Sequence, residues 1–331
     1  MQTRRRFFST ALGAIFGAHA AFSQDALRRH RLAEMFANDQ DPSVAPGRPD
    51  PASWDNNALS ATWIGHSTIL INFFGFNIIT DPVFSERIGL NIAGLFTIGP
   101  RRLVQPALAF EELPHIDLIL ISHAHWDHLD TPTLKRFERS IPVVMAKNTA
   151  DIIEDFEFQK VYELDWGHWT VIGDLTVEAL PVRHFGWRYP WEQDRSRGNP
   201  DGRSYNAYLL SRKGRHIVFG GDTAYHEMFR ALRTRQLPIE LAMMPIGAYD
   251  PWITNHATPE QSLAMADQMG SSAILPMHWG TFIQSEEPTT EPIVRLRQAM
   301  GTTSLCLALE AIGQTWTVPA PGEENRGTAN G

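Results

Sequence analysis

Four potential metal ligands occur within six consecutive residues of this chain, His123-Ala124-His125-Trp126-Asp127-His128. The apolar run 118–121 before them predicts a buried strand, and Ser122 begins the loop at its carboxyl end, where open α/β sheets place their ligands. The first two histidines are two positions apart on an extended segment and would project to the same side. The spacing therefore indicates one ion between these imidazoles and a second ion beside the Asp-His pair. Thr131 and Pro132 are predicted as the N-cap and first residue of a following helix.

Further candidate ligands each follow another apolar strand of the sequence. They are His184 after residues 176–182, Asp222 after residues 216–219, and His278 after residues 273–276. Taken alone, a histidine in such a place is more often a hydrogen-bonded core or loop residue than a ligand. Because the pattern repeats at three strand ends, it favours one shared site, with coordination positions left open for water.

Several sequence blocks, spread over about 220 residues, match one known family in order. They occur at residues 62–68, 80–84, 99–102, 121–130, 220–223, 245–249 and 277–282. On these blocks the sequence resembles the metallo-β-lactamase superfamily, and within it the phospholipases D that hydrolyse N-acylphosphatidylethanolamine, together with related lactonase-type hydrolases. The ligand loop is typical of the whole superfamily, whereas Pro-Ile-Gly-Ala-Tyr and His-Trp-Gly-Thr-Phe point to the phospholipase branch. The fold that this resemblance implies is an α/β architecture, the αββα sandwich.

The resemblance also implies a pair of metal ions held by seven side chains. The first ion would take His123, His125 and His184, the second would take Asp127, His128 and His278, and Asp222 would bridge them. Two Zn²⁺ ions are what the resemblance implies, and the same imidazole and carboxylate ligands also accept iron or manganese.

The implied activity is that of a metal-dependent hydrolase whose nucleophile is a hydroxide activated by two metals. Asp127 and Asp222 are the predicted catalytic carboxylates. His256 is a candidate for contact with a substrate phosphate or for protonation of the leaving group, although hydrogen bonds that stabilise a loop are a competing interpretation for His256 and for His66. Asp81, after the predicted strand 77–80, is expected to accept a hydrogen bond from a ligand imidazole.

The resemblance to the phospholipase branch also implies a substrate class. The leading hypothesis is a phospholipase D-like phosphodiesterase acting on N-acylphosphatidylethanolamine-like phospholipids. The alternatives are a lactonase or another ester or phosphoester hydrolase of the superfamily, and a non-catalytic metal-binding protein. The apolar segment 88–98 is compatible with acyl-chain entry, with peripheral membrane contact, or with a packed lid. The aromatic and Arg-rich segment 187–199 is predicted to shape the pocket.

Net charge limits the kinds of partner that the protein is expected to bind, and the cysteine content bears on its core. The chain has 29 basic and 37 acidic residues, a net charge of −8. Without residues 1–23, which contain three Arg and no acid, the count is 26 against 37, or −11. This balance argues against nucleic acid as a partner, and the sequence carries no indication of oligomeric state. Cys306 is the only cysteine, and its apolar surroundings predict a core position.

The ends of the chain suggest the domain organisation. Thr3-Arg4-Arg5-Arg6-Phe7-Phe8, a short apolar stretch and small residues near position 23 resemble a twin-arginine export signal, which predicts a periplasmic protein. Residues 24–56 are predicted as an N-terminal arm with a short helix at 26–36, residues 57–318 as the metallo-hydrolase domain, and residues 319–331 as a disordered tail. Within the domain, a second strand-rich half is expected to begin near Asn206.

Overall fold

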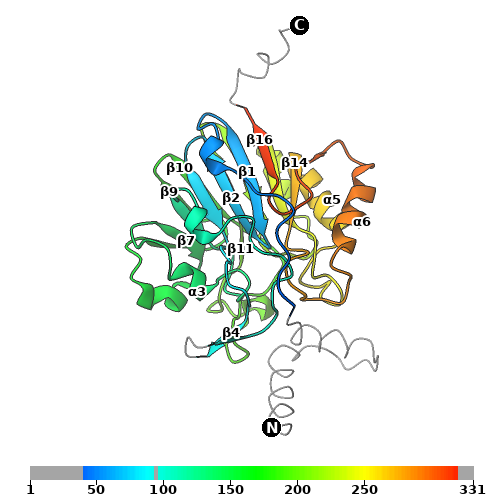
Figure 1. Ribbon diagram of the computed structural model, residues 1–331. Helices are drawn as coiled ribbons and strands as arrows, with labels where there is room; N and C mark the ends of the chain where they lie inside the picture. Colours follow the sequence, from blue (N-terminus) through cyan, green and yellow to red (C-terminus); the bar gives the residue numbers. More distant parts are fainter. Residues whose placement is uncertain (1–39, 93–95, 320–331) are drawn as a thin grey trace.

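Two mixed seven-stranded β-sheets lie at the centre of the computed structural model, which describes residues 40–92 and 96–319 (Figure 1). The first sheet has the order β16-β1-β2-β3-β6-β7-β8. Its strands are β1 (Leu59–Gly65), β2 (Thr68–Phe73), β3 (Asn77–Thr80), β6 (Leu118–Leu120), β7 (Val143–Ala146), β8 (Val161–Leu164) and β16 (Thr315–Val318). Every residue of β1, β2, β6 and β7 is buried, as expected for strands that are covered on both faces.

The second sheet has the order β15-β14-β13-β12-β11-β10-β9. Its strands are β9 (Trp169–Ile172), β10 (Leu175–Pro181), β11 (Asn206–Arg212), β12 (Arg215–Phe219), β13 (Ile239–Pro245), β14 (Ser271–Met277) and β15 (Cys306–Leu307). Strands β12 to β15 run parallel, whereas β9 to β12 form an antiparallel meander. A separate hairpin consists of β4 (Leu90–Ile92) and β5 (Phe96–Ile98).

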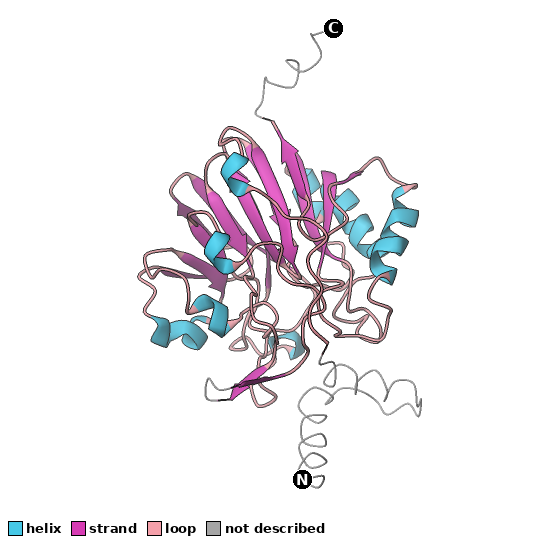
Figure 2. Cartoon of the chain, viewed as in Figure 1, coloured by secondary structure: helices cyan, strands magenta, loops and turns pink. Residues whose placement is uncertain are grey.

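Helices lie outside the two sheets and complete the predicted αββα sandwich (Figure 2). The α-helices are α3 (Thr131–Leu134), α4 (Arg230–Thr234), α5 (Pro259–Met269) and α6 (Glu291–Met300), and short 3₁₀ helices are η1 (Pro51–Ser53), η2 (Phe110–Glu112), η3 (Ala150–Phe156) and η4 (Arg195–Arg197). Within residues 40–92 and 96–319, no helix has the length and apolar character needed to cross a membrane.

The core consists of two apolar clusters. The larger cluster joins residues of both sheets, such as Leu120 of the first and Leu275 of the second, so it fills the space between them. The smaller cluster lies where α5 and α6 pack on the outer face of the second sheet, through residues such as Met265 and Leu296. Burial of these side chains stabilises the fold by roughly 25 cal/mol per Å² of apolar surface removed from water.

Helix α5 begins and ends as the sequence predicts. Thr258 and Gln261 form the capping box, Pro259 occupies the first turn, and Gly270 ends the helix with φ +78°. This ending fixes the start of β14, which leads to His278.

Three predictions about local structure are wrong. The second sheet begins at β9, before Asn206, because β9 pairs with β10 and β10 pairs with β11, the strand that starts at Asn206. The N-cap of α3 is Asp130, so Thr131 is already helical. Cys306 is exposed, since alternation along the two-residue edge strand β15 turns it away from the buried Leu305.

The proposed ends of the chain lie mostly outside the described residues. This applies to the export signal at 1–23, the helix at 26–36 and the tail from 320. The described part of the N-terminal arm runs along the domain, where Ser43 bridges to Val104 and the Gly47 amide donates to the Ile312 carbonyl over 3.0 Å. The division into domains stays a prediction.

Candidate metal centre

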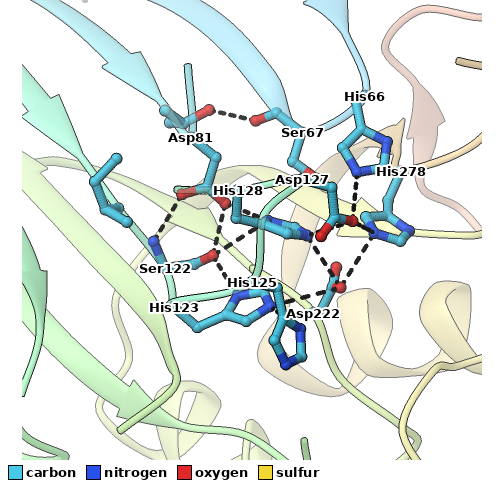
Figure 3. A network of polar contacts seen from close by, with 12 residues as sticks. His66, Ser67, Asp81, Ser122, His123, His125, Asp127, His128, Asp222 and His278 are labelled. Atoms are coloured by element: carbon cyan, nitrogen blue, oxygen red, sulfur yellow. Dashed lines mark hydrogen bonds and ion pairs between the residues drawn. The ribbon is translucent and has the colours of Figure 1, made fainter. Parts of the chain in front are cut away.

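The seven predicted ligands meet at one end of the sandwich. β3 and β6 run parallel, so Asp81 and the ligand loop leave the first sheet at the same edge. In the second sheet β10, β12 and β14 have a common direction, which brings the residues that follow them to that edge too. Figure 3 shows the resulting network of imidazoles and carboxylates. The rule that ligands gather at the carboxyl ends of strands therefore holds for both layers.

The first cluster consists of three histidines. His123 Nε2 lies 2.8 Å from His125 Nδ1, and His184 Nε2 lies 3.3 Å from the same nitrogen. The Nδ1 of His184 is 2.9 Å from the Asn255 carbonyl oxygen, to which it must donate a hydrogen. His184 is therefore held with the lone pair of Nε2 facing the other two imidazoles.

The second cluster centres on Asp127. Its Oδ2 lies 3.4 Å from His128 Nε2 and 3.3 Å from His278 Nε2. His66, at the turn between β1 and β2, adds its Nε2 at 2.9 Å from the same oxygen. These four side chains offer ligand atoms that all lie within 4.8 Å of one another.

Asp222 lies between the two clusters. Its Oδ2 is 3.1 Å from Nε2 of both His128 and His278, and it is 4.0 and 3.9 Å from Nε2 of His123 and His184. One carboxylate oxygen thus faces imidazoles of both clusters. This is the position that the predicted bridging ligand requires, and the bridging role itself stays a prediction.

The donor set fits divalent cations. Two of its buried polar atoms have no hydrogen-bond partner within the described part of the chain, namely His128 Nε2, which faces Asp127 and Asp222, and Asp222 Oδ1. Buried polar groups are normally paired, because leaving one unpaired costs roughly 1–3 kcal/mol. Cations would satisfy ligand atoms that otherwise face only one another.

The electrostatics of His123, His125 and Asp222 agree with this fit. Burial lowers the pKa of His123 and His125 well below the usual value, and neighbouring imidazoles add to the effect, so both are neutral ligands at neutral pH. Burial alone would raise the pKa of Asp222, but the charges of His128 and His278 lower it well below the ordinary value. The carboxylate is therefore ionised, as a metal ligand must be.

Asp81 is placed as predicted. Its Oδ2 lies 2.6 Å from His128 Nδ1, and Oδ1 accepts the Ser122 amide hydrogen over 2.7 Å. A carboxylate that accepts from Nδ1 leaves the other ring nitrogen, Nε2, free for a metal.

Two residues of the site were not found from the sequence. Gln284, in the loop after β14, donates from Nε2 to Asp127 Oδ2 over 2.6 Å. The buried guanidinium of Arg188 donates to the carbonyls of Ala124 and Leu129 over 2.6 and 3.1 Å, and so ties both ends of the ligand loop. Nothing in the local sequence singles out Gln284, and Arg188 stood in the segment that was expected to shape the pocket.

His256 and one aromatic pair lie beside the clusters. His256 Nδ1 is 3.8 Å from Asp222 Oδ2, and its ring centroid is 5.1 Å from that of His184. Phe185 and Trp187 lie 4.4 and 6.5 Å from the His125 ring, between centroids, and give the site an apolar wall. Only the beginning of the segment 187–199 thus faces the site, and Trp191, 78% exposed, does not contact these rings.

The hairpin segment 88–98 is anchored beside the site at its base. Ile88 is buried and packs with Val83 and Phe282, and the Phe282 ring lies 5.3 Å from that of His66, between centroids. Leu90 and Ile92 are half-buried. The base of the segment therefore packs against the domain, while residues 93–95 lie outside the described part.

Comparisons with known proteins identify the family. The model of the β-lactamase superfamily domain matches residues 76–279, which include all seven predicted ligands. The chain belongs to this superfamily. A relative from Mycobacterium tuberculosis, an uncharacterised protein, is 31% identical over 272 residues, which cover 78% of this chain and 69% of that protein.

Two further proteins are similar to this chain. The N-acyl-phosphatidylethanolamine-hydrolyzing phospholipase D 1 of Caenorhabditis elegans is 28% identical over 261 residues, covering 74% of this chain and 70% of that protein. The solved structure of Igni18, a metallo hydrolase from Ignicoccus hospitalis, superimposes with a TM-score of 0.56 at 17% identity, covering 79% of this chain and 98% of that one. The predicted metallo-β-lactamase fold is confirmed, and the chain is a metal-dependent hydrolase of the superfamily.

Replacement of Asp222 tests the shared carboxylate. Asp222→Asn removes the charge that faces both clusters, so we expect at most one divalent ion per chain, compared with the two that are predicted for the unaltered protein. Elemental analysis after gel filtration measures this. Asp174→Asn, which changes a carboxylate on the surface that pairs with Arg212, should keep both ions. Two tightly held ions in Asp222→Asn would contradict the bridging assignment.

Proposed function

We propose that the protein is a phosphodiesterase of the phospholipase D type that acts on N-acylphosphatidylethanolamine-like phospholipids. The observation that carries this proposal is the similarity to the C. elegans phospholipase along 74% of the chain. Membership of the superfamily supports the reaction class, metal-dependent hydrolysis. The similarity to the phospholipase supports the substrate class, a phospholipid.

The arrangement of two sequence blocks supports the branch. Blocks 245–249 and 278–282 follow the parallel strands β13 and β14 and lie side by side. A Cβ atom on Gly247 would lie 2.4 Å from the His278 carbonyl oxygen, so only glycine allows this approach. The two blocks that point to the phospholipase branch therefore pack against each other beside the proposed ligand His278.

The surroundings suit an amphiphilic phosphodiester. The apolar wall of Phe185 and Trp187 lies next to His125, and the packed base of the hairpin 88–98 lies next to His66. Such a site can accept apolar groups of a lipid on one side and hold its anionic phosphate near the metal ligands.

The roles of the chain's own residues follow from their positions. His123, His125, His184, Asp127, His128, His278 and Asp222 would hold two divalent cations, which we propose to be Zn²⁺. When bound, such a pair lowers the pKa of a water molecule and offsets the negative charge on phosphoryl oxygens. Asp127 is held in place by His66 and Gln284, which both donate to its Oδ2.

His256 is proposed to contact the phosphoryl group. Burial lowers its pKa to about 3, so the imidazole is neutral and carries one N–H to donate. Its Nδ1 has no hydrogen-bond partner among the described residues, although it lies beside Asp222. A donor in this position would stabilise charge as it develops on the substrate.

A substrate assay tests the proposed activity. Purified metal-loaded protein should release N-acylethanolamine from vesicles that contain labelled N-acylphosphatidylethanolamine, and an excess of chelator should abolish this release. A panel of lactones assayed in parallel provides the comparison. Hydrolysis of lactones with the lipid left intact would refute the phospholipase proposal in favour of the lactonase alternative.

Replacement of His256 tests its role. We expect His256→Ala to lower kcat by roughly 10² to 10⁴-fold, the usual range for the loss of one positioned proton donor or transition-state partner. Metal content, measured alongside, should stay at two ions per chain. His115→Ala, which alters an exposed histidine, is the matched control. Unchanged turnover, or a loss of metal that accounts for the defect, would contradict contact with substrate.

We further propose that the protein is exported to the periplasm. The support is the motif Thr3-Arg4-Arg5-Arg6-Phe7-Phe8 with the apolar stretch after it. Replacing Arg4 and Arg5 together by Lys should retain the protein in the cytoplasm, as measured by cell fractionation. A doubly substituted protein that still reached the periplasm would contradict export by the twin-arginine route.

A further inference from the structure

Ser122 lies between one imidazole of each metal cluster. It is the second residue after β6, and it is fully buried. Its Oγ lies 2.6 Å from Asp81 Oδ2, 2.9 Å from His123 Nδ1 and 3.4 Å from His128 Nδ1 (Figure 3). The hydroxyl therefore touches a residue of the first cluster, a residue of the second and the carboxylate that supports them.

The direction of each hydrogen bond follows from the available hydrogens. Asp81 accepts from the Ser122 amide and from His128 Nδ1, and as a carboxylate it has no hydrogen of its own to offer. The single hydroxyl hydrogen of Ser122 must therefore point to Asp81. The hydroxyl oxygen is then an acceptor, so the hydrogen of His123 resides on Nδ1.

We propose that the Ser122 hydroxyl is a positioning residue that selects the metal-binding tautomer of His123. With hydrogen on Nδ1, the lone pair of His123 is on Nε2, the nitrogen that lies 2.8 Å from His125 Nδ1 in the first cluster. Through Asp81 the same hydroxyl is connected to His128, whose Nε2 faces Asp222 in the second cluster. The inference concerns the binding of metal and does not depend on which substrate is hydrolysed.

Loss of the hydroxyl should act unequally on the two ions. Without it, the Nδ1 hydrogen of the buried His123 has no acceptor, and the tautomer with hydrogen on Nε2, which has no lone pair facing the first cluster, gains population. His128 keeps its hydrogen bond to Asp81, so its affinity for metal should change little. Groups that support a ligand in this way typically contribute 10 to 100-fold to metal affinity.

Ser67 provides a matched control. It is a second fully buried serine, in the turn between β1 and β2, and its Oγ has no hydrogen-bond partner within the described part of the chain. Ser67→Ala thus removes a buried hydroxyl that supports no ligand.

The test compares Ser122→Ala and Ser67→Ala in the full chain. Competition with a chromophoric chelator gives the dissociation constants of the two Zn²⁺ ions. We expect Ser122→Ala to raise the dissociation constant of one ion by 10 to 100-fold and that of the other by no more than a few-fold. Ser67→Ala should leave both dissociation constants unchanged. Unaltered affinities in Ser122→Ala, or an equal loss in both variants, would overturn the proposal.

The tautomer of His123 gives a second readout that needs neither bound metal nor activity. In metal-free protein with ¹⁵N-labelled histidine, the His123 ring nitrogens should show the Nδ1–H form, and Ser122→Ala should shift them towards the Nε2–H form. A merely structural role would not move this signal. An Nε2–H form in the unaltered protein would overturn the proposal, even if Ser122→Ala folds too poorly for the metal titration.

Discussion

The crowding of unpaired ligand atoms in a buried space is the constraint on which the rest of this structure depends. Imidazole nitrogens and carboxylate oxygens from six separate loops approach one another within 4.8 Å in overlapping groups. Such groups repel one another or lose hydration when they are buried without partners. These atoms are kept in place by the two sheets, by the loops after their strands and by the groups that hydrogen-bond to the ligands. Bound cations would offset the free-energy cost of burying them.

The backbone is also strained where it holds these side chains. His66, Asp81 and His278 each have a positive φ, at 54°, 32° and 61°, in a region that side chains other than glycine rarely adopt. Conformations of this kind cost roughly 1–3 kcal/mol each and persist where the surroundings impose them. The His278 amide donates to the His66 carbonyl and the Asp81 amide donates to Leu120, so hydrogen bonds between strand ends hold the strained residues. Strain and function therefore coincide at the same edge of the sandwich.

The sequence was sufficient to predict that the seven proposed ligands come together, because each follows an apolar run that is typical of a strand or lies in the loop after one. It was also sufficient for Asp81, whose place after β3 made it a neighbour of the ligand loop. Gln284 was beyond its reach, since its contact with Asp127 joins residues 157 positions apart through loop packing. Ser122 was identified only as the start of the ligand loop, because its hydrogen-bond partners depend on Asp81, 41 positions earlier. Local patterns predicted the strands, and contacts between distant loops determined what surrounds the ligands.

The pairing of β16 with β1 has a consequence for how the molecule is made. Thr315 lies opposite Thr62, and their hydroxyls are in contact across 253 positions of sequence. The sheet that carries the histidine loop thus closes only after the ribosome has produced almost the whole domain, and contacts between such distant segments form slowly. The outer edge of the first sheet would accordingly be completed late, after nearly all of the domain has been synthesised.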